Sequence, residues 1–123
     1  MKRLLRVTFL LKVFSCLSHA VTVTQDKAFI LLSVGSSMDE MSCTHDATSS
    51  YRMYWYLQKP GEGLVLIAMS VAENDASLEK DFKEMWTMTR PNNQKSMLKR
   101  NGAVNITDSA VYYCAASDTA IAN

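Results

Sequence analysis

Beyond residue 20 the chain consists of short segments in which apolar and polar residues alternate, with turn-forming residues between them at intervals of roughly 8 to 12 positions. Alternation with a period of two places successive side chains on opposite faces of a β-strand. A series of such strands is typical of two packed β-sheets. We therefore predict an all-β sandwich, with strands at residues 21–25, around 41–43, and at 53–58, 64–69, 86–89, 96–100 and 110–116.

Turn signals connect several of these strands. The cluster Pro60, Gly61 and Gly63 favours a hairpin between residues 53–58 and 64–69. The run from Arg90 to Lys95 is expected to be a turn between the next two strands. Residues 70–83 are polar and acidic, and a weak helical pattern covers residues 77–84.

Two of the strands are expected to expose aromatic residues. In the strand at 53–58, Met53 and Trp55 share one face. In the strand at 110–116, Tyr112 and Cys114 point inward if Cys114 forms a disulfide. If the two strands are neighbours, their outer residues form a patch of the kind that normally contacts a partner. The alternative is a scatter of exposed tyrosines. The residues of this predicted patch are Tyr54, Tyr56, Val111 and Tyr113.

The N-terminus and the cysteines indicate the secretory pathway. Residues 1–20 have a basic start, a short apolar stretch and a small-residue finish at Ala20, as in a cleavable signal peptide; an amphipathic helix is the alternative. Cleavage would remove Cys16 and leave Cys43 and Cys114 for one disulfide in an oxidising compartment. No later segment reaches the roughly 18 apolar residues that a membrane span requires, so any anchor is expected outside this chain.

Charge and chemistry exclude several functions. The formal net charge of +1 favours neither nucleic acid nor an anionic membrane. We find no nucleophile with a base, no metal-ligand spacing and no phosphate loop, so we predict no enzyme activity, metal or cofactor. His45, beside Asp46 in a polar segment, is expected to be a solvated or contact residue.

Three features together resemble the variable-type immunoglobulin domain: Cys43, Trp55 in the sequence Trp-Tyr-Leu-Gln, and the run from Asp108 to Cys114. The resemblance implies an immunoglobulin V-type β-sandwich with Greek-key topology at residues 21–117, in which the tryptophan packs on the disulfide and Tyr112 forms the tyrosine corner. No Phe-Gly-x-Gly motif precedes Asn123. We therefore expect the final strand to be missing and residues 118–123 to be a truncated third-loop tail.

Short signatures within this framework look most like a T-cell receptor β-chain variable segment: Val23-Thr24-Gln25, the stretch 53–56, the stretch 90–94 and the ending 112–117. The other chain of that receptor, an antibody light chain, another immune or adhesion receptor, or an unproductive germline segment are the alternatives. The resemblance implies a domain at the extracellular face of the plasma membrane that binds peptide displayed by a histocompatibility molecule, as one half of a heterodimer.

The resemblance also assigns residues by position. Antigen-contact loops are expected at Asp46, Thr48, Ser49, Ser50 and Tyr51, at Ser70, Val71, Glu73 and Asn74, and at Ser117 and Asp118. The paired variable domain is expected to contact Tyr56, Gln58, Leu64 and Tyr113, with the Gln58 amide bonding to an equivalent glutamine of the partner. The alternative for Gln58 is a solvated glutamine at a strand end.

Three positions depart from the family pattern. Met85 stands where an arginine usually pairs with the aspartate equivalent to Asp108, so we expect that ion pair to be lost and Asp108 to cap its turn. Alternation places Asp39 and Arg100 inward, where they either pair with each other or are exposed by a register shift. The triplet from Asn105 to Thr107 is an N-glycosylation sequon.

Overall fold

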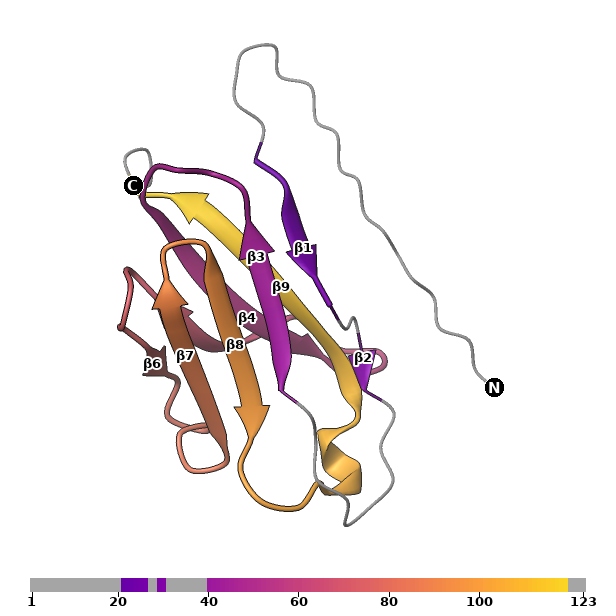
Figure 1. The fold of residues 1–123 in the computed structure, drawn as a ribbon. Helices are drawn as coiled ribbons and strands as arrows, with labels where there is room; N and C mark the ends of the chain where they lie inside the picture. Colours follow the sequence, from indigo (N-terminus) through magenta and orange to yellow (C-terminus); the bar gives the residue numbers. More distant parts are fainter. Residues whose placement is uncertain (1–20, 27–28, 31–39, 120–123) are drawn as a thin grey trace.

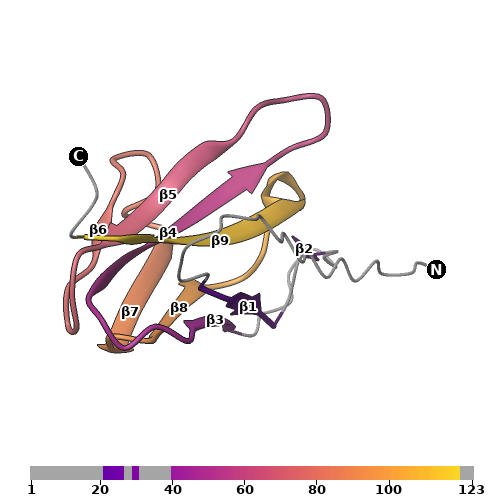
Figure 2. The same cartoon turned by 90° about the horizontal axis from the view of Figure 1, so that it is seen from above.

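The computed structural model describes residues 21–26, 29–30 and 40–119, and these form two packed β-sheets (Figure 1). One sheet has the strand order β1-β3-β8-β7 and the other β2-β9-β4-β5-β6. Seen from above, β4, β5 and β9 lie in one layer and β1, β3 and β8 in the other (Figure 2). The strands are β1 (Val23–Gln25), β2 (Phe29–Ile30), β3 (Met41–His45), β4 (Tyr51–Gln58), β5 (Val65–Ser70), β6 (Ser77–Leu78), β7 (Trp86–Asn92), β8 (Lys95–Arg100) and β9 (Ala110–Asp118).

The predicted two-sheet sandwich is confirmed, with corrections at several boundaries. The expected helical segment at 77–84 is wrong: Ser77–Leu78 is the short strand β6, and turns follow it up to Met85. The last strand continues to Asp118 rather than ending at residue 116. The expected signal peptide, the C-terminal residues 120–123 and Asp39 lie outside the described residues.

The core lies between the sheets and is joined by the predicted disulfide between Cys43 and Cys114. Trp55, directly opposite Cys114 in the ladder, has 0 % exposed surface. Its indole Nε1 donates a 3.0 Å hydrogen bond to the Ser96 hydroxyl on the facing sheet, which satisfies the only polar atom of the ring. Apolar side chains surround this centre, including Met41, Met53, Ile67, Leu98 and Tyr112.

An ion pair with Asp108 lies at one end of the sandwich, but it comes from a different residue than position 85, where the usual arginine is replaced as the sequence indicated. Met85 does lie exposed on a turn, but Arg100 at the end of β8 donates from Nε to the Asp108 carboxylate at 2.9 Å. Arg100 is buried, as alternation predicted, whereas its predicted pairing with Asp39 is not tested because Asp39 lies outside the described residues. Gly102, with a φ of 78°, turns the chain so that β8 returns toward Asp108.

Asp108 organises its own turn as well. Its carboxylate accepts a hydrogen bond from the Asn105 backbone N–H, completing a capping box at the short 3-10 helix η1 (Ile106–Asp108), as the expected turn cap requires. Its carbonyl accepts a hydrogen bond from the Tyr112 hydroxyl, which forms the expected tyrosine corner. Burial, followed by the negative charge of Asp108, raises the pKa of Tyr112. The phenol is therefore a neutral donor at any physiological pH.

Candidate functional site

The outer surface of the five-stranded sheet carries the predicted aromatic patch. β4 and β9 pair along their whole length, from Tyr51 opposite Asp118 to Gln58 opposite Val111, so the condition for that patch is met. Tyr56 lies directly opposite Tyr113, and the rings of Tyr54 and Tyr56 stack with centroids 6.2 Å apart. We call this surface the tyrosine face; it comprises Tyr54, Tyr56, Val111 and Tyr113 together with Leu66 and Met69 of β5.

The tyrosine face is half-buried within the isolated chain and partly ordered by hydrogen bonds. The Tyr54 hydroxyl lies 2.8 Å from the Ser117 hydroxyl across β4 and β9. Gln58, predicted to bond to a partner glutamine, donates from its amide nitrogen to the Glu62 carbonyl of its own hairpin at 2.8 Å. Its amide oxygen is an acceptor that this bond does not use. Leu64, at the edge of the face, is 55 % exposed.

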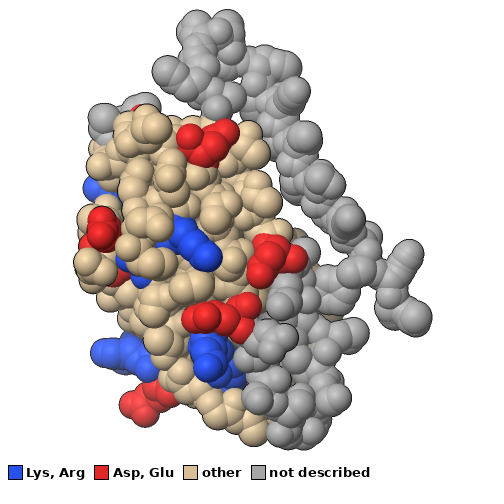
Figure 3. Space-filling view, viewed as in Figure 1, with Lys and Arg blue, Asp and Glu red and all other residues tan. Residues whose placement is uncertain are grey.

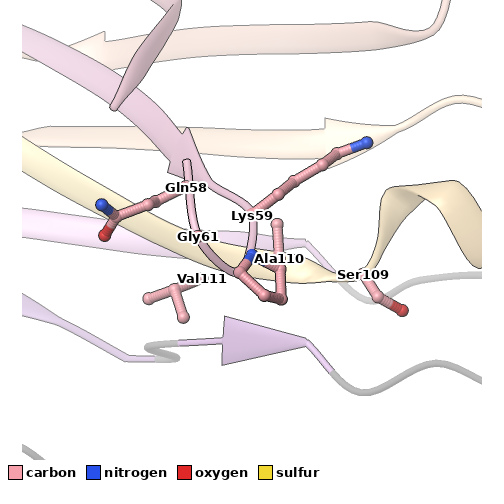
Figure 4. Close-up of a pocket in the computed structure, with 7 residues that line it drawn as sticks. Gln58, Lys59, Gly61, Ser109, Ala110 and Val111 are labelled. Carbon is pink, nitrogen blue, oxygen red and sulfur yellow. The ribbon is translucent and has the colours of Figure 1, made fainter. Parts of the chain in front are cut away.

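A shallow recess of about 430 Å³ lies between the β4–β5 hairpin and the start of β9 (Figure 4). The side chains of Gln58 and Lys59 point in opposite directions there, and Val111 contributes an apolar wall. No acid and base face each other across it, so the recess offers shape rather than reactive groups. Its lining residues are Gln58, Lys59, Pro60, Gly61, Ser109, Ala110 and Val111.

The predicted antigen-contact residues gather at one end of the sandwich. The first loop, between β3 and β4, exposes Asp46, Thr48, Ser49 and Ser50. The Thr119 N–H donates to the Ser50 carbonyl at 3.3 Å, so the end of β9 lies beside this first loop. Tyr51 begins β4 and pairs with Asp118. The second loop, after β5, exposes Val71, Glu73 and Asn74.

Two parts of this assignment need correction. Ser70 has no exposed surface; its hydroxyl donates to the Ala72 carbonyl, so this side chain supports the second loop from beneath instead of facing outward. The third loop was expected to begin after Cys114. Instead β9 stays paired with β4 as far as Asp118, which places Ser117 on the tyrosine face beside Tyr54.

A buried arginine, in a segment that the sequence predicted to be a turn, lies beneath these loops. Arg90 belongs to β7 and is 2 % exposed; only Asn93 and Gln94 form the turn that joins β7 to β8. Trp86, Met88 and Arg90 alternate inward, so the period-two pattern already contained this signal. Burial lowers the pKa of Arg90, opposed by the charge of Asp75. A guanidinium remains charged in proteins despite such burial.

The Arg90 side chain donates hydrogen bonds to neutral oxygens of three segments. Its partners are the Tyr51 carbonyl at 2.7 Å, the Ser70 carbonyl at 3.2 Å and hydroxyl at 3.0 Å, and the carbonyls of Asn92 and Asn93. Asn93 extends the network, because its amide accepts from the Tyr51 N–H and donates to the Ser49 carbonyl. We call this network the loop junction; it comprises Arg90, Asn93, Tyr51, Ser70, Asn92 and Ser49.

His45 contacts the loop junction through the Asn93 carbonyl, and it is buried, not solvated as predicted. It is 4 % exposed; Nδ1 accepts from the Ala47 N–H at 3.1 Å, and Nε2 lies 2.8 Å from the Asn93 carbonyl. These contacts assign the neutral tautomer with the proton on Nε2. Burial is the main cause that lowers the pKa of His45, and the positive charge of Arg90 lowers it further. The hydrogen bond to the Asn93 carbonyl and the negative charge of Asp46 act in the opposite direction.

The lowered pKa of His45 predicts a loss of stability on acidification. As pH falls below about 6.5, His45 in the unfolded chain takes up a proton while the folded chain resists it. We therefore expect the free energy of unfolding to decrease from about pH 7 down to the folded-state pKa, and to level off below it. Urea unfolding at several pH values measures this. A His45→Gln variant should lack this component, and an equal pH dependence in both proteins would contradict the prediction.

In the described part of the chain, neither the surface charge nor the metal-ligating side chains indicate a further binding site. Acidic and basic side chains are interspersed over the face shown in Figure 3, without a surface of one sign. Among residues 21–26, 29–30 and 40–119 no three metal-ligating side chains come together. The same residues include no helix with the length and apolar character needed to cross a bilayer.

Comparison with known proteins agrees with this architecture. Residues 25–123 match the model of the immunoglobulin V-set domain. Human T cell receptor alpha variable 9-2 is 34 % identical over 96 residues, which cover 78 % of this chain and 81 % of that segment. Human T cell receptor beta variable 6-6 is also 34 % identical, covering 77 % and 80 %. A solved chain from a study of T cell specificity and activation by the superantigen toxic shock syndrome toxin-1 aligns with a TM-score of 0.71 at 25 % identity, covering 80 % of this chain and 83 % of that one.

The disulfide-joined sandwich with its tyrosine corner and these relatives place the chain in the immunoglobulin V-set family. Within that family it is a T-cell receptor variable domain, a non-enzymatic domain that takes part in antigen recognition.

Proposed function

We propose that this chain is one of the two variable domains of a T-cell receptor heterodimer at the extracellular face of the plasma membrane, and that its loop end contacts peptide displayed by a histocompatibility molecule. The tyrosine face is the observation that carries the pairing. Tyr56 and Tyr113 lie opposite each other at its centre, and Leu64 is exposed at its edge. Aromatic residues of this kind are enriched in interfaces, where one large ring buries much apolar area.

The arrangement of the loops supports the second half of the proposal. Exposed polar residues of two loops and the end of β9 lie side by side at one end of the sandwich, next to the tyrosine face. Paired domains would therefore present their loops together. Loops on a rigid scaffold are the usual place for recognition residues, because the strands fix the loop ends while the loop sequence varies.

Charge substitutions test the pairing. We expect Tyr56→Arg with Tyr113→Arg to reduce heterodimer assembly more than tenfold, because two cations would have to be buried without partners. Thr89→Arg, exposed on the opposite sheet, is the control and should assemble normally. The chain, joined to its downstream receptor segments, is co-expressed with candidate partner chains and surface heterodimer is counted. Normal assembly of the tyrosine variant would refute pairing through this face.

The type of receptor chain is a finer proposal. Sequence signatures favour a β segment, whereas alpha segments from human, rabbit and mouse are also among the relatives, at 29 to 34 % identity. We retain β as the proposal and α as its alternative. Sequencing lymphocyte transcripts decides between them, because the joining and constant segments identify the chain. Transcripts that join this segment only to α constant sequence would overturn the β assignment. Transcripts that continue directly into a stalk or membrane span would favour a different V-type receptor.

We also propose that Asn105 carries an N-linked glycan. Asn105 is exposed, and its Oδ1 accepts from the N–H and the hydroxyl of Thr107, both within the sequon. A glycan attaches through Nδ2, so this cap can persist after modification. Endoglycosidase treatment of protein from the secretory pathway should reduce its mass by one glycan, and Asn105→Gln should abolish the shift. An unchanged mass after treatment would refute the proposal.

A further inference from the structure

We propose that Arg90 and Asn93 are positioning residues for the first and second antigen-contact loops, so that the end of β7 and the β7–β8 turn control loop geometry without touching the ligand. This inference rests on the proposed function only for the role of the loops in recognition. The positioning itself follows from contacts within the chain.

Arg90 connects the boundaries of both loops. One guanidinium nitrogen donates to the Tyr51 carbonyl, where the first loop ends, and another donates to the carbonyl and hydroxyl of Ser70, where the second loop begins. A guanidinium is planar and holds its donors at fixed angles. The two boundaries are therefore held at one separation, and neither can shift without breaking a charge-assisted hydrogen bond in a buried place.

The backbone of Arg90 holds the second loop at a further point. The Asn74 N–H donates to the Arg90 carbonyl at 2.8 Å, and Asn74 adopts a left-handed conformation with a φ of 64°. Asparagine tolerates this region better than most residues, although it still costs energy. Arg90 thus contacts the second loop at Ser70 through its side chain and at Asn74 through its main chain.

Asn93 and its neighbour hold the first loop at three points. The Asn93 side chain accepts from the Tyr51 N–H at 3.2 Å and donates to the Ser49 carbonyl at 2.9 Å. Gln94 donates from its side chain to the Ala47 carbonyl at 2.9 Å. The exposed first loop is therefore bonded along its length to the turn, which explains how a polar segment acquires one defined path.

The chain offers a matched pair of asparagines for the test. Asn92 is exposed, and its side chain bonds only inside the turn, to the Gln94 N–H at 2.9 Å. Asn93→Ala removes the two side-chain bonds of Asn93 to the first loop, and Asn92→Ala removes a bond of similar length that does not reach it. Arg90→Lys keeps the positive charge but loses the planar set of donors.

Amide hydrogen exchange on the purified full chain, without partner or ligand, measures the effect. The informative amides are those of Ala47 and Asn74, because their acceptors, His45 Nδ1 and the Arg90 carbonyl, remain in every variant. We expect exchange at Ala47 to rise at least tenfold in Asn93→Ala, and exchange at Asn74 to rise at least tenfold in Arg90→Lys. Asn92→Ala should change both by less than twofold, and amides around the disulfide should stay unchanged in all three.

Two outcomes would overturn the positioning role. Unchanged exchange at Ala47 and Asn74 in Asn93→Ala and Arg90→Lys would show that the loops hold their geometry without the junction. An equal rise at all amides, including those near Cys43 and Trp55, would show that the residues support only global stability. Because no ligand or partner is present, either outcome is independent of whether the domain pairs or binds displayed peptide.

Discussion

Replacing Cys43 and Cys114 together by alanine is expected to lower the free energy of unfolding by about 4 kcal/mol. The disulfide spans 71 residues of sequence, so its loss frees a long loop in the unfolded chain and favours that state. Trp55, which lies opposite Cys114 in the core, would also lose packing contacts. For a domain of this size the change removes a large share of a stability that is typically about 5 to 15 kcal/mol.

Urea titration of the double variant and the oxidised parent chain checks this value. A reducing agent provides the matched control, because it should bring the parent chain close to the variant and leave the variant unchanged. Coincident unfolding of the oxidised parent and the variant would contradict the prediction, and would mean that the sheets hold together without the covalent link.

Replacing Asp108 by alanine is expected to cost about 3 to 5 kcal/mol, the range for breaking a buried ion pair by removing one partner. The side chains of Arg100 and Asp108 are 9 % and 11 % exposed, so Arg100 would keep a charge that water scarcely reaches. The same substitution removes the acceptor of the Asn105 N–H and opens the capping box. Equilibrium unfolding in urea measures the loss.

A double-mutant cycle separates the ion pair from the cap. Arg100→Met alone should also be strongly destabilising, whereas Arg100→Met with Asp108→Ala should cost clearly less than the two single changes added together. Lys99→Met is the control, because Lys99 is exposed on the same strand and should matter by less than about 0.5 kcal/mol. Strict additivity of the two single variants would show that the pair contributes no coupling energy.

Alternation predicted the parts of the fold that a single strand determines. Met53 and Trp55 point into the core and Tyr54 and Tyr56 point outward, because one residue of β-strand reverses the side-chain direction. The same rule placed Tyr112 inward and Arg100 inside the sandwich. These positions required no knowledge of which strands are neighbours.

The prediction failed where the structure depends on how the chain turns back and which segments it brings together. The ion pair of Arg100 with Asp108 was not predicted, because it depends on the turn at Gly102 that returns the chain toward Asp108, and the sequence alone does not determine that geometry. Arg90 was assigned to a turn because its polar neighbours suggested one, although its acceptors at Tyr51 and Ser70 are 39 and 20 residues away. The alternation from Trp86 to Arg90 indicated that Arg90 points inward, but the local sequence does not indicate which distant oxygens accept its hydrogen bonds.

Because side chains of β4 point to both faces of the sheet, the domain is expected to tolerate few changes in the length of this strand. Along this strand, residues that point into the core, such as Trp55, alternate with residues of the tyrosine face, such as Tyr56. Inserting or deleting one residue would exchange the two sets, burying phenols and exposing the indole. Length changes are therefore expected only in the connections between strands, which leaves the loop end as the part of the molecule where new shapes can arise without disturbing the core or the tyrosine face.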